Sequence, residues 1–129
     1  QGAASRCQTA LVVIGRAAGE SRENALEPGS YYLTPEEKAM LSQVTKAFAN
    51  EWGSRGICVN AIAPGYIKTD MTKALQDNET AYSDILKKIP LGRWGTPDDL
   101  VGPVLLLASD ASAYVNGIVM PIDGGFLTR

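Results

Sequence analysis

Arg93 and Trp94 form an adjacent pair whose side chains could line a pocket for a polar small molecule. A guanidinium group can bind a carboxylate through two parallel hydrogen bonds, which gives Arg93 a role in substrate binding. Packing of Trp94 and a surface ion pair of Arg93 explain the same residues equally well. The sequence contains no histidine, which excludes Ser-His-Asp and Cys-His nucleophile systems and removes the usual zinc ligand. We therefore expect no metal site.

The two cysteines, Cys7 and Cys58, are too few to form a disulfide framework. Cys58 lies in the apolar run 57–63, which predicts a strand. We interpret its thiol as buried and chemically inert, which is typical of proteins from a reducing compartment. A cytoplasmic location is the corresponding expectation.

Composition limits the class of protein. The 129 residues include 12 Lys plus Arg and 14 Asp plus Glu, a net charge of −2, so binding of nucleic acid through bulk positive charge is excluded. A hydrophobic fraction of 45% excludes a disordered tail. No apolar stretch is long enough to cross a membrane. We predict a single domain over residues 1–129, with a divergent segment at 1–33.

Helical and strand patterns alternate along the chain. Apolar runs predict three strands, and periodic segments predict helices between them. This alternation is typical of a parallel sheet covered by helices, so the predicted fold class is α/β. The predicted strands are 10–14, 57–63 and 118–122; the predicted helices are 35–52 and 97–108, with a polar, helix-prone segment at 70–89.

Two tetrapeptides have the composition of helix starts, Thr34-Pro35-Glu36-Glu37 and Thr96-Pro97-Asp98-Asp99. In each, a threonine cap is followed by a proline at the first helical position and an acidic residue at the third. We interpret Thr34 as the N-cap of the first helix. The predicted apolar faces are Met40, Val44, Ala47, Phe48 and Trp52 in the first helix, and Leu100, Val101, Val104, Leu105 and Ala108 in the second.

Five separated segments keep a recognisable order and spacing: Ala47–Trp52, Gly56–Thr69, Pro90–Gly95, Ala108–Ser112 and Asn116–Gly125. Together they resemble the short-chain dehydrogenase/reductase family over about residues 38–129. Its gluconate and deoxygluconate dehydrogenases are the most similar branch. The resemblance implies the C-terminal half of a Rossmann-like, doubly wound parallel sheet, and hydride transfer between NAD(P) and a carbonyl or alcohol. The matched region would supply the catalytic helix and the substrate lid.

At the positions of the family's catalytic residues, this sequence departs from the family pattern. The resemblance places the catalytic lysine at Lys38, the tyrosine slot at Thr34 and the serine at Ser21. A threonine hydroxyl does not ionise near neutral pH and cannot replace a phenol in proton transfer. Tyr32 is a nearby phenol, but it is not one helical turn from Lys38. Lys38 fits an exposed first-turn lysine as well as a cofactor ligand.

Of the two parts of the family's cofactor site, this sequence matches the nicotinamide loop but not the phosphate-binding turn. Pro64, Gly65, Ile67 and Thr69 match the loop that holds the nicotinamide amide in the family, and Tyr66 would face the substrate together with Arg93 and Trp94. The phosphate-binding turn Gly-x-x-x-Gly-x-Gly has no full match, because Ser21 follows Gly15 and Gly19 at the third position. The run at 10–14 fits either the first or the fifth strand of the family fold, and we prefer the fifth.

Three functions remain open at this point. The chain could be an oxidoreductase whose first half was removed or lies on another chain. It could be a non-redox lyase, isomerase or cyclase that uses the lid pocket, or a non-catalytic protein that joins an oligomer. We expect no cofactor for this chain alone, NAD(P) by family resemblance, and a small-molecule substrate as a possible ligand. We also expect a homo-oligomer, most simply a dimer, because a parallel sheet needs cover on both faces.

Overall fold

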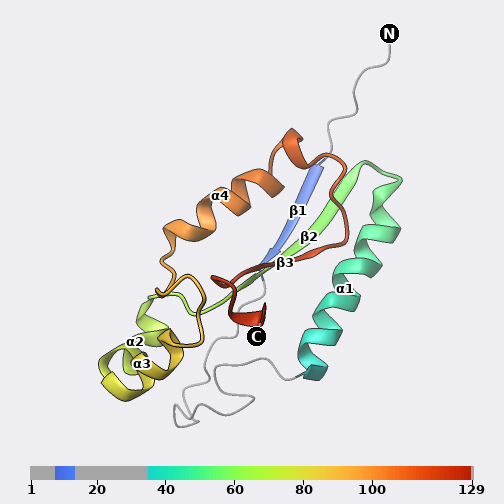
Figure 1. Ribbon diagram of the computed structural model, residues 1–129. Helices are drawn as coiled ribbons and strands as arrows, with labels where there is room; N and C mark the ends of the chain where they lie inside the picture. The colour runs from blue at the N-terminus through green and yellow to red at the C-terminus, as the bar shows by residue number, and fades with distance from the viewer. Residues whose placement is uncertain (1–7, 14–34, 129) are drawn as a thin grey trace.

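The computed structural model describes residues 8–13 and 35–128. The elements follow the predicted alternation of strands and helices (Figure 1). In chain order they are β1 (Gln8–Val13), α1 (Pro35–Gly53), β2 (Ile57–Pro64), η1 (Asp70–Thr72), α2 (Lys73–Asp77), α3 (Glu79–Leu86), α4 (Asp98–Leu107), η2 (Asp110–Ser112), β3 (Val119–Ile122) and η3 (Phe126–Thr128).

The three strands form one parallel sheet in the order β1-β2-β3. Gln8 pairs with Ile57 at one end of the first pairing, and Pro64 pairs with Ile122 at the end of the second. In the second half of a doubly wound sheet, strands that follow one another in the chain are also neighbours in the sheet. The first strand of the whole fold, in contrast, lies at the centre of the sheet. The pairing therefore agrees with the interpretation of the first run as a fifth strand.

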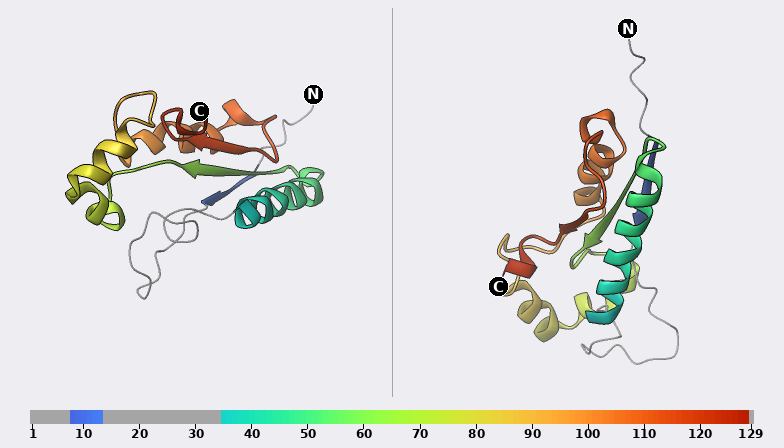
Figure 2. Two further views of the ribbon diagram at one scale, coloured as in Figure 1. Left: turned by 60° about the horizontal axis from the view of Figure 1, so that its bottom comes forward. Right: turned by 90° about the vertical axis from the view of Figure 1, so that its right-hand side faces the viewer.

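Helices cover both faces of the sheet. Helix α1 packs on one face, against β2, and α4 lies on the opposite face, where it contacts all three strands (Figures 1 and 2). β2 is buried from Cys58 to Ile62, and Val59 and Ala61 are fully buried. Cys58 is buried, as predicted, and its thiol lies 3.7 Å from the carbonyl oxygen of Ala113.

The predicted apolar face of α1 is wrong in part. Phe48 and Trp52 are half-buried, but Met40 and Val44 are 59% and 39% exposed. Among the side chains of the helix that the structure describes, Thr45 and Ala49 are the buried ones. Small side chains on this row let the helix approach the sheet closely. The Thr45 hydroxyl is satisfied inside the helix because it donates to the carbonyl of Leu41 at 2.9 Å, so a polar residue can lie in the core.

The predicted apolar face of α4 also needs correction. Val101 and Leu105 are exposed, and Leu107, which the pattern did not select, is fully buried. Ala108 lies just after the helix and is exposed as well. The segment is apolar on most sides, so periodicity did not identify the face that the sheet covers.

The helix-prone segment 70–89 consists of three short elements, η1, α2 and α3, which we call the lid segment (residues 70–86). Asn78 separates the two α-helices, and its side-chain oxygen accepts a hydrogen bond from the Ala81 amide at 3.0 Å. This is an N-cap, which ends one helix and starts the next. The lid segment packs through Leu75 and Ile85 on a second core.

Several predicted catalytic residues lie outside the described residues: Ser21, Tyr32 and Thr34. The backbone of Lys38 belongs to the first turn of α1, but its side chain lies outside the described part of the structure. The observed start of α1 at Pro35 agrees with the predicted helix start.

Candidate functional site

The loop that follows β2 leaves the sheet at its carboxyl end. Ligands of open α/β sheets bind beyond this edge, which makes the loop 64–69 the first candidate. The Gly65 amide donates to the carbonyl of Ile122 at 2.9 Å and continues the pairing of β2 with β3. A Cβ on Gly65 would lie 2.6 Å from Cα of Asp123, so only glycine permits this approach of the two backbones.

The second half of the loop is fixed by side chains of the lid segment. The Thr72 hydroxyl donates to the carbonyl of Ile67 at 2.8 Å and accepts the amide of Thr69 at 3.1 Å. Gln76 donates to the carbonyl of Thr69 at 3.0 Å. These bonds hold the backbone of the loop at Ile67 and Thr69, and the Thr69 side chain remains on the exposed surface.

A second loop, residues 87–97 between α3 and α4, lies beside the loop 64–69. The Gly95 amide donates to the carbonyl of Tyr66, and the Lys68 amide donates to the carbonyl of Gly95, both at 2.9 Å. These bonds form a short parallel bridge between Ile67 and Gly95. The bridge joins the predicted nicotinamide loop to the start of α4.

The Arg93 guanidinium forms a two-pronged ion pair with Asp99. Its nitrogens lie 2.6 and 2.8 Å from the two carboxylate oxygens. Asp99 also accepts the Thr96 amide at 2.7 Å, which is the acidic half of a capping box at the start of α4. The predicted carboxylate clamp thus binds a carboxylate of this chain, and the surface ion pair describes Arg93 in this structure.

The ion pair shifts the pKa of both groups. Hydrogen bonds from Arg93, and then the one from the Thr96 amide, hold the pKa of the Asp99 carboxyl well below its usual range. The hydrogen bond to Asp99 in turn raises the pKa of Arg93. Both charged forms are therefore favoured at neutral pH.

Asp99 is expected to remain ionised at an acidity that protonates ordinary aspartates, whose pKa is about 3.9. Its stabilising contribution is present above that value and is lost as the pH falls through the lower, folded-state pKa. The carboxyl ¹³C chemical shift of Asp99, followed from neutral to acid pH, measures this. In Arg93→Gln the midpoint should move upward. An ordinary midpoint in the unmodified protein would contradict the ion pair.

Tyr66 and Trp94, the other predicted substrate residues, belong to an aromatic cluster. The Trp94 ring stacks on Tyr82 at 5.3 Å between centroids, and Tyr66 meets it edge-on at 5.1 Å. Trp94 is 1% exposed and Tyr66 is 9% exposed. The packing interpretation therefore describes Trp94, whose side chain lies in the core beneath the lid segment.

A small pocket of about 140 Å³ opens between the two loops and the end of β3. Tyr66 and Arg93 are among its lining residues, and Trp94 is not. The Asp123 carboxylate at its rim accepts the amides of Gly125 and Leu127 at 2.8 and 3.0 Å. The charged groups around this pocket are therefore already engaged within the chain.

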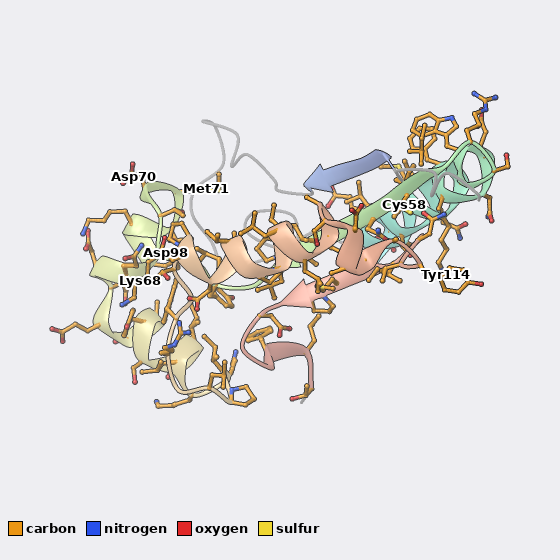
Figure 3. All side chains as sticks on the ribbon, turned by 90° about the horizontal axis from the view of Figure 1, so that it is seen from above. Cys58, Lys68, Asp70, Met71, Asp98 and Tyr114 are labelled. Carbon is orange, nitrogen blue, oxygen red and sulfur yellow. The ribbon has the colours of Figure 1, made fainter. Side chains whose placement is uncertain are left out.

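The loop after β2 and the start of α4 lie at the same end of the molecule. Figure 3 shows Lys68, Asp70 and Met71 near Asp98, whereas Cys58 and Tyr114 lie at the opposite end. Among the residues that the structure describes, no cluster of His, Cys, Asp or Glu could hold a metal ion. Within the same residues, no helix is both long and apolar enough to cross a membrane.

A parallel sheet with helices on both faces defines a doubly wound α/β protein, in which ligands bind beyond the carboxyl ends of the strands. A family model described as enoyl-(acyl carrier protein) reductase matches residues 22–127. The chain belongs to the short-chain dehydrogenase/reductase family.

Two named relatives and two solved structures show the similarity. The chain is 55% identical over 92 residues to 2-dehydro-3-deoxy-D-gluconate 5-dehydrogenase of Bacillus subtilis, which covers 71% of this chain and 36% of the relative. It is 36% identical over 117 residues to galactitol 2-dehydrogenase (L-tagatose-forming) of Cereibacter sphaeroides, covering 91% and 45%.

Among solved structures, gluconate 5-dehydrogenase of Burkholderia cenocepacia in complex with NADP and tartrate has a TM-score of 0.76 at 30% identity, covering 94% of this chain and 45% of that one. The Pseudomonas aeruginosa RhlG/NADP active-site complex has a TM-score of 0.76 at 33% identity, covering 96% and 46%. The chain thus spans less than half the length of these relatives.

Three residues that shape the site were not singled out for it from the sequence: Thr72, Gly95 and Asp99. The capping-box pattern at 96–99 did contain a signal, because its acidic third residue must face back toward the loop. Thr72 and Gly95 carry no comparable signal, since their partners are backbone groups of another loop.

Proposed function

We propose that this chain provides the nicotinamide loop and the substrate lid of a short-chain oxidoreductase acting on a sugar acid. The reaction is hydride transfer between NADP(H) and a carbonyl or alcohol carbon. The observation that carries the proposal is the hydrogen-bonded loop 64–69 at the carboxyl end of β2. The similarity to sugar-acid dehydrogenases supports the substrate class.

The residues of the loop fit the nicotinamide end of the cofactor. Gly65 keeps the backbone close to Asp123 at the end of β3, and Thr69 places a hydroxyl on the open side of the loop. A nicotinamide, when bound, supplies or accepts the hydride. The chain's own contribution is to hold the loop that orients the ring, through Thr72 and Gln76.

The phosphate-binding end of the cofactor has no counterpart motif in these 129 residues. We therefore propose that the chain alone is not redox-competent, because a pyrophosphate needs a glycine-rich turn at a helix N-terminus. The non-redox and non-catalytic alternatives stay predictions, and no described contact favours either of them. A cytoplasmic location is likewise proposed, in keeping with the buried thiol of Cys58.

Titration of the chain into NADPH, followed by cofactor fluorescence, tests the proposal. We expect binding weaker than millimolar for the chain alone, since only the nicotinamide end of the cofactor has a matching loop. Addition of a relative's dinucleotide-binding half should restore binding, whereas turnover of a sugar acid also needs a phenol where this chain has Thr34. Micromolar binding by the chain alone would contradict the missing-turn argument.

A homo-oligomer is the expected state in solution. Both covering helices expose large apolar side chains, which include Met40 at 59% on α1 and Leu105 at 62% on α4. Exposed apolar surface of this kind favours association, and a two-fold dimer is the simplest arrangement. Light scattering should give about twice the chain mass of 13.7 kDa or a higher multiple. A monomer mass that persists on dilution would exclude this state.

A further inference from the structure

We infer that Arg93 and Asp99 are positioning residues for the loop after β2, acting through Gly95 rather than on a ligand. The inference rests on the proposed function, because it gives the ion pair a role at the nicotinamide loop.

The two loops contact each other at Gly95. Gly95 is the residue through which the second loop bonds the first, with one hydrogen bond to Tyr66 and one from Lys68. These two bonds bracket Ile67, the central residue of the predicted nicotinamide contact. A Cβ on Gly95 would lie 2.5 Å from Cδ1 of Ile67, so the absence of a side chain at Gly95 leaves room for the Ile67 side chain between the two loops.

The Arg93–Asp99 ion pair holds the residues on both sides of Gly95. The ion pair joins Arg93 to Asp99 across the loop that contains Gly95, and Arg93 also donates to the carbonyl of Trp94 at 3.1 Å. Asp99 accepts the amide and the hydroxyl of Thr96 at 2.7 and 3.1 Å. Both residues flanking Gly95 are therefore bonded to the same ion pair.

The two-pronged geometry of the Arg93–Asp99 ion pair, rather than its charge, gives it a specific effect on the loop. A guanidinium binds two carboxylate oxygens at once, whereas an ammonium group binds as a point charge. Arg93 is more than half exposed, so the charge alone contributes little to global stability. The specific effect of the two-pronged bond is to fix the position of Gly95 against Ile67.

Amide hydrogen exchange in the full chain tests this inference. In Arg93→Lys and in Asp99→Asn, we expect exchange of the Gly95 and Lys68 amides to accelerate about tenfold, since their opening no longer breaks the ion pair. The Ala61 amide, which donates to Ile118 inside the sheet, should be unchanged. Lys73→Gln is the matched control, because it removes the exposed ion pair with Asp77 and should leave the Gly95 and Lys68 amides as they are.

Reduced nicotinamide mononucleotide is the ligand probe, because it carries the ring without the second phosphate and the adenosine. At millimolar concentration it should shift the Ile67 and Thr69 amide resonances in the unmodified chain, and several-fold less in Arg93→Lys. Unchanged exchange of Gly95 and Lys68 in both variants overturns the inference, whether or not the probe binds. Faster exchange without any probe shift leaves the positioning role standing and removes support from the proposed function.

Discussion

Replacement of Trp94 by alanine is expected to lower the free energy of unfolding by about 3–5 kcal/mol, the range for buried aromatic residues. Trp94 is 1% exposed and lies between the rings of Tyr82 and Tyr66. Its removal leaves a cavity beneath the lid segment and deprives Tyr82 of its stacking partner and Tyr66 of an edge-on contact. Urea unfolding of the variant and the unmodified chain measures the difference.

Two further variants separate packing from polarity. Trp94→Phe keeps most of the buried ring and removes Nε1, which is buried with no hydrogen-bond partner among the described residues. We therefore expect it to cost less than about 1.5 kcal/mol. Trp52→Ala is the matched control, because this half-buried ring stacks on Phe48 at 4.5 Å and part of it already contacts water. Equal losses for Trp94→Ala and Trp52→Ala would contradict the assignment of Trp94 to the core.

The positions of the strands and helices could be predicted from the sequence, because their signals are local. The apolar run 57–63 predicted a strand that the structure extends by one residue to Pro64. The threonine-proline pair at 96–97 placed the start of α4 within a residue. Proline and capping residues act on their own few neighbours, so such signals survive into the fold.

The buried faces of the helices could not be predicted from periodicity. Thr45 is polar and Ala49 is small, so neither ranks as a core residue by type, yet both lie against the sheet. Their burial depends on how closely α1 approaches β2, which no local pattern encodes. Met40 and Val44 were selected for their hydrophobicity and are exposed, where a partner surface could cover them.

One part of the candidate site could likewise be predicted from the sequence, and another part could not. The loop 64–69 could be located by family resemblance, and the structure places it at the carboxyl end of β2. The partner of Arg93 could not be chosen, since Asp98 and Asp99 are adjacent and equally acidic. Only the residue three positions after Thr96 faces back to the loop, and this geometry selects Asp99.

Asn60 is expected to give the second large effect, a loss of about 3 kcal/mol on replacement by alanine, from two broken hydrogen bonds and a cavity. Its side chain is fully buried in the middle of β2. The amide nitrogen donates to the carbonyl of Val115 at 2.8 Å, and the amide oxygen accepts the Ile118 amide at 3.2 Å. One side chain thus joins β2 to the backbone that leads into β3.

Replacement of Asn60 by leucine distinguishes the two causes. Leucine has the same branched shape and is larger, so it leaves no cavity, but it leaves the Val115 carbonyl and the Ile118 amide without their partner. We expect Asn60→Leu to lose most of the stability that Asn60→Ala loses. Asn50→Ala on the exposed side of α1 is the control and should change the unfolding free energy by less than about 0.5 kcal/mol. A leucine variant as stable as the unmodified chain would show that packing alone, and not the paired amide, holds the connection between the two strands.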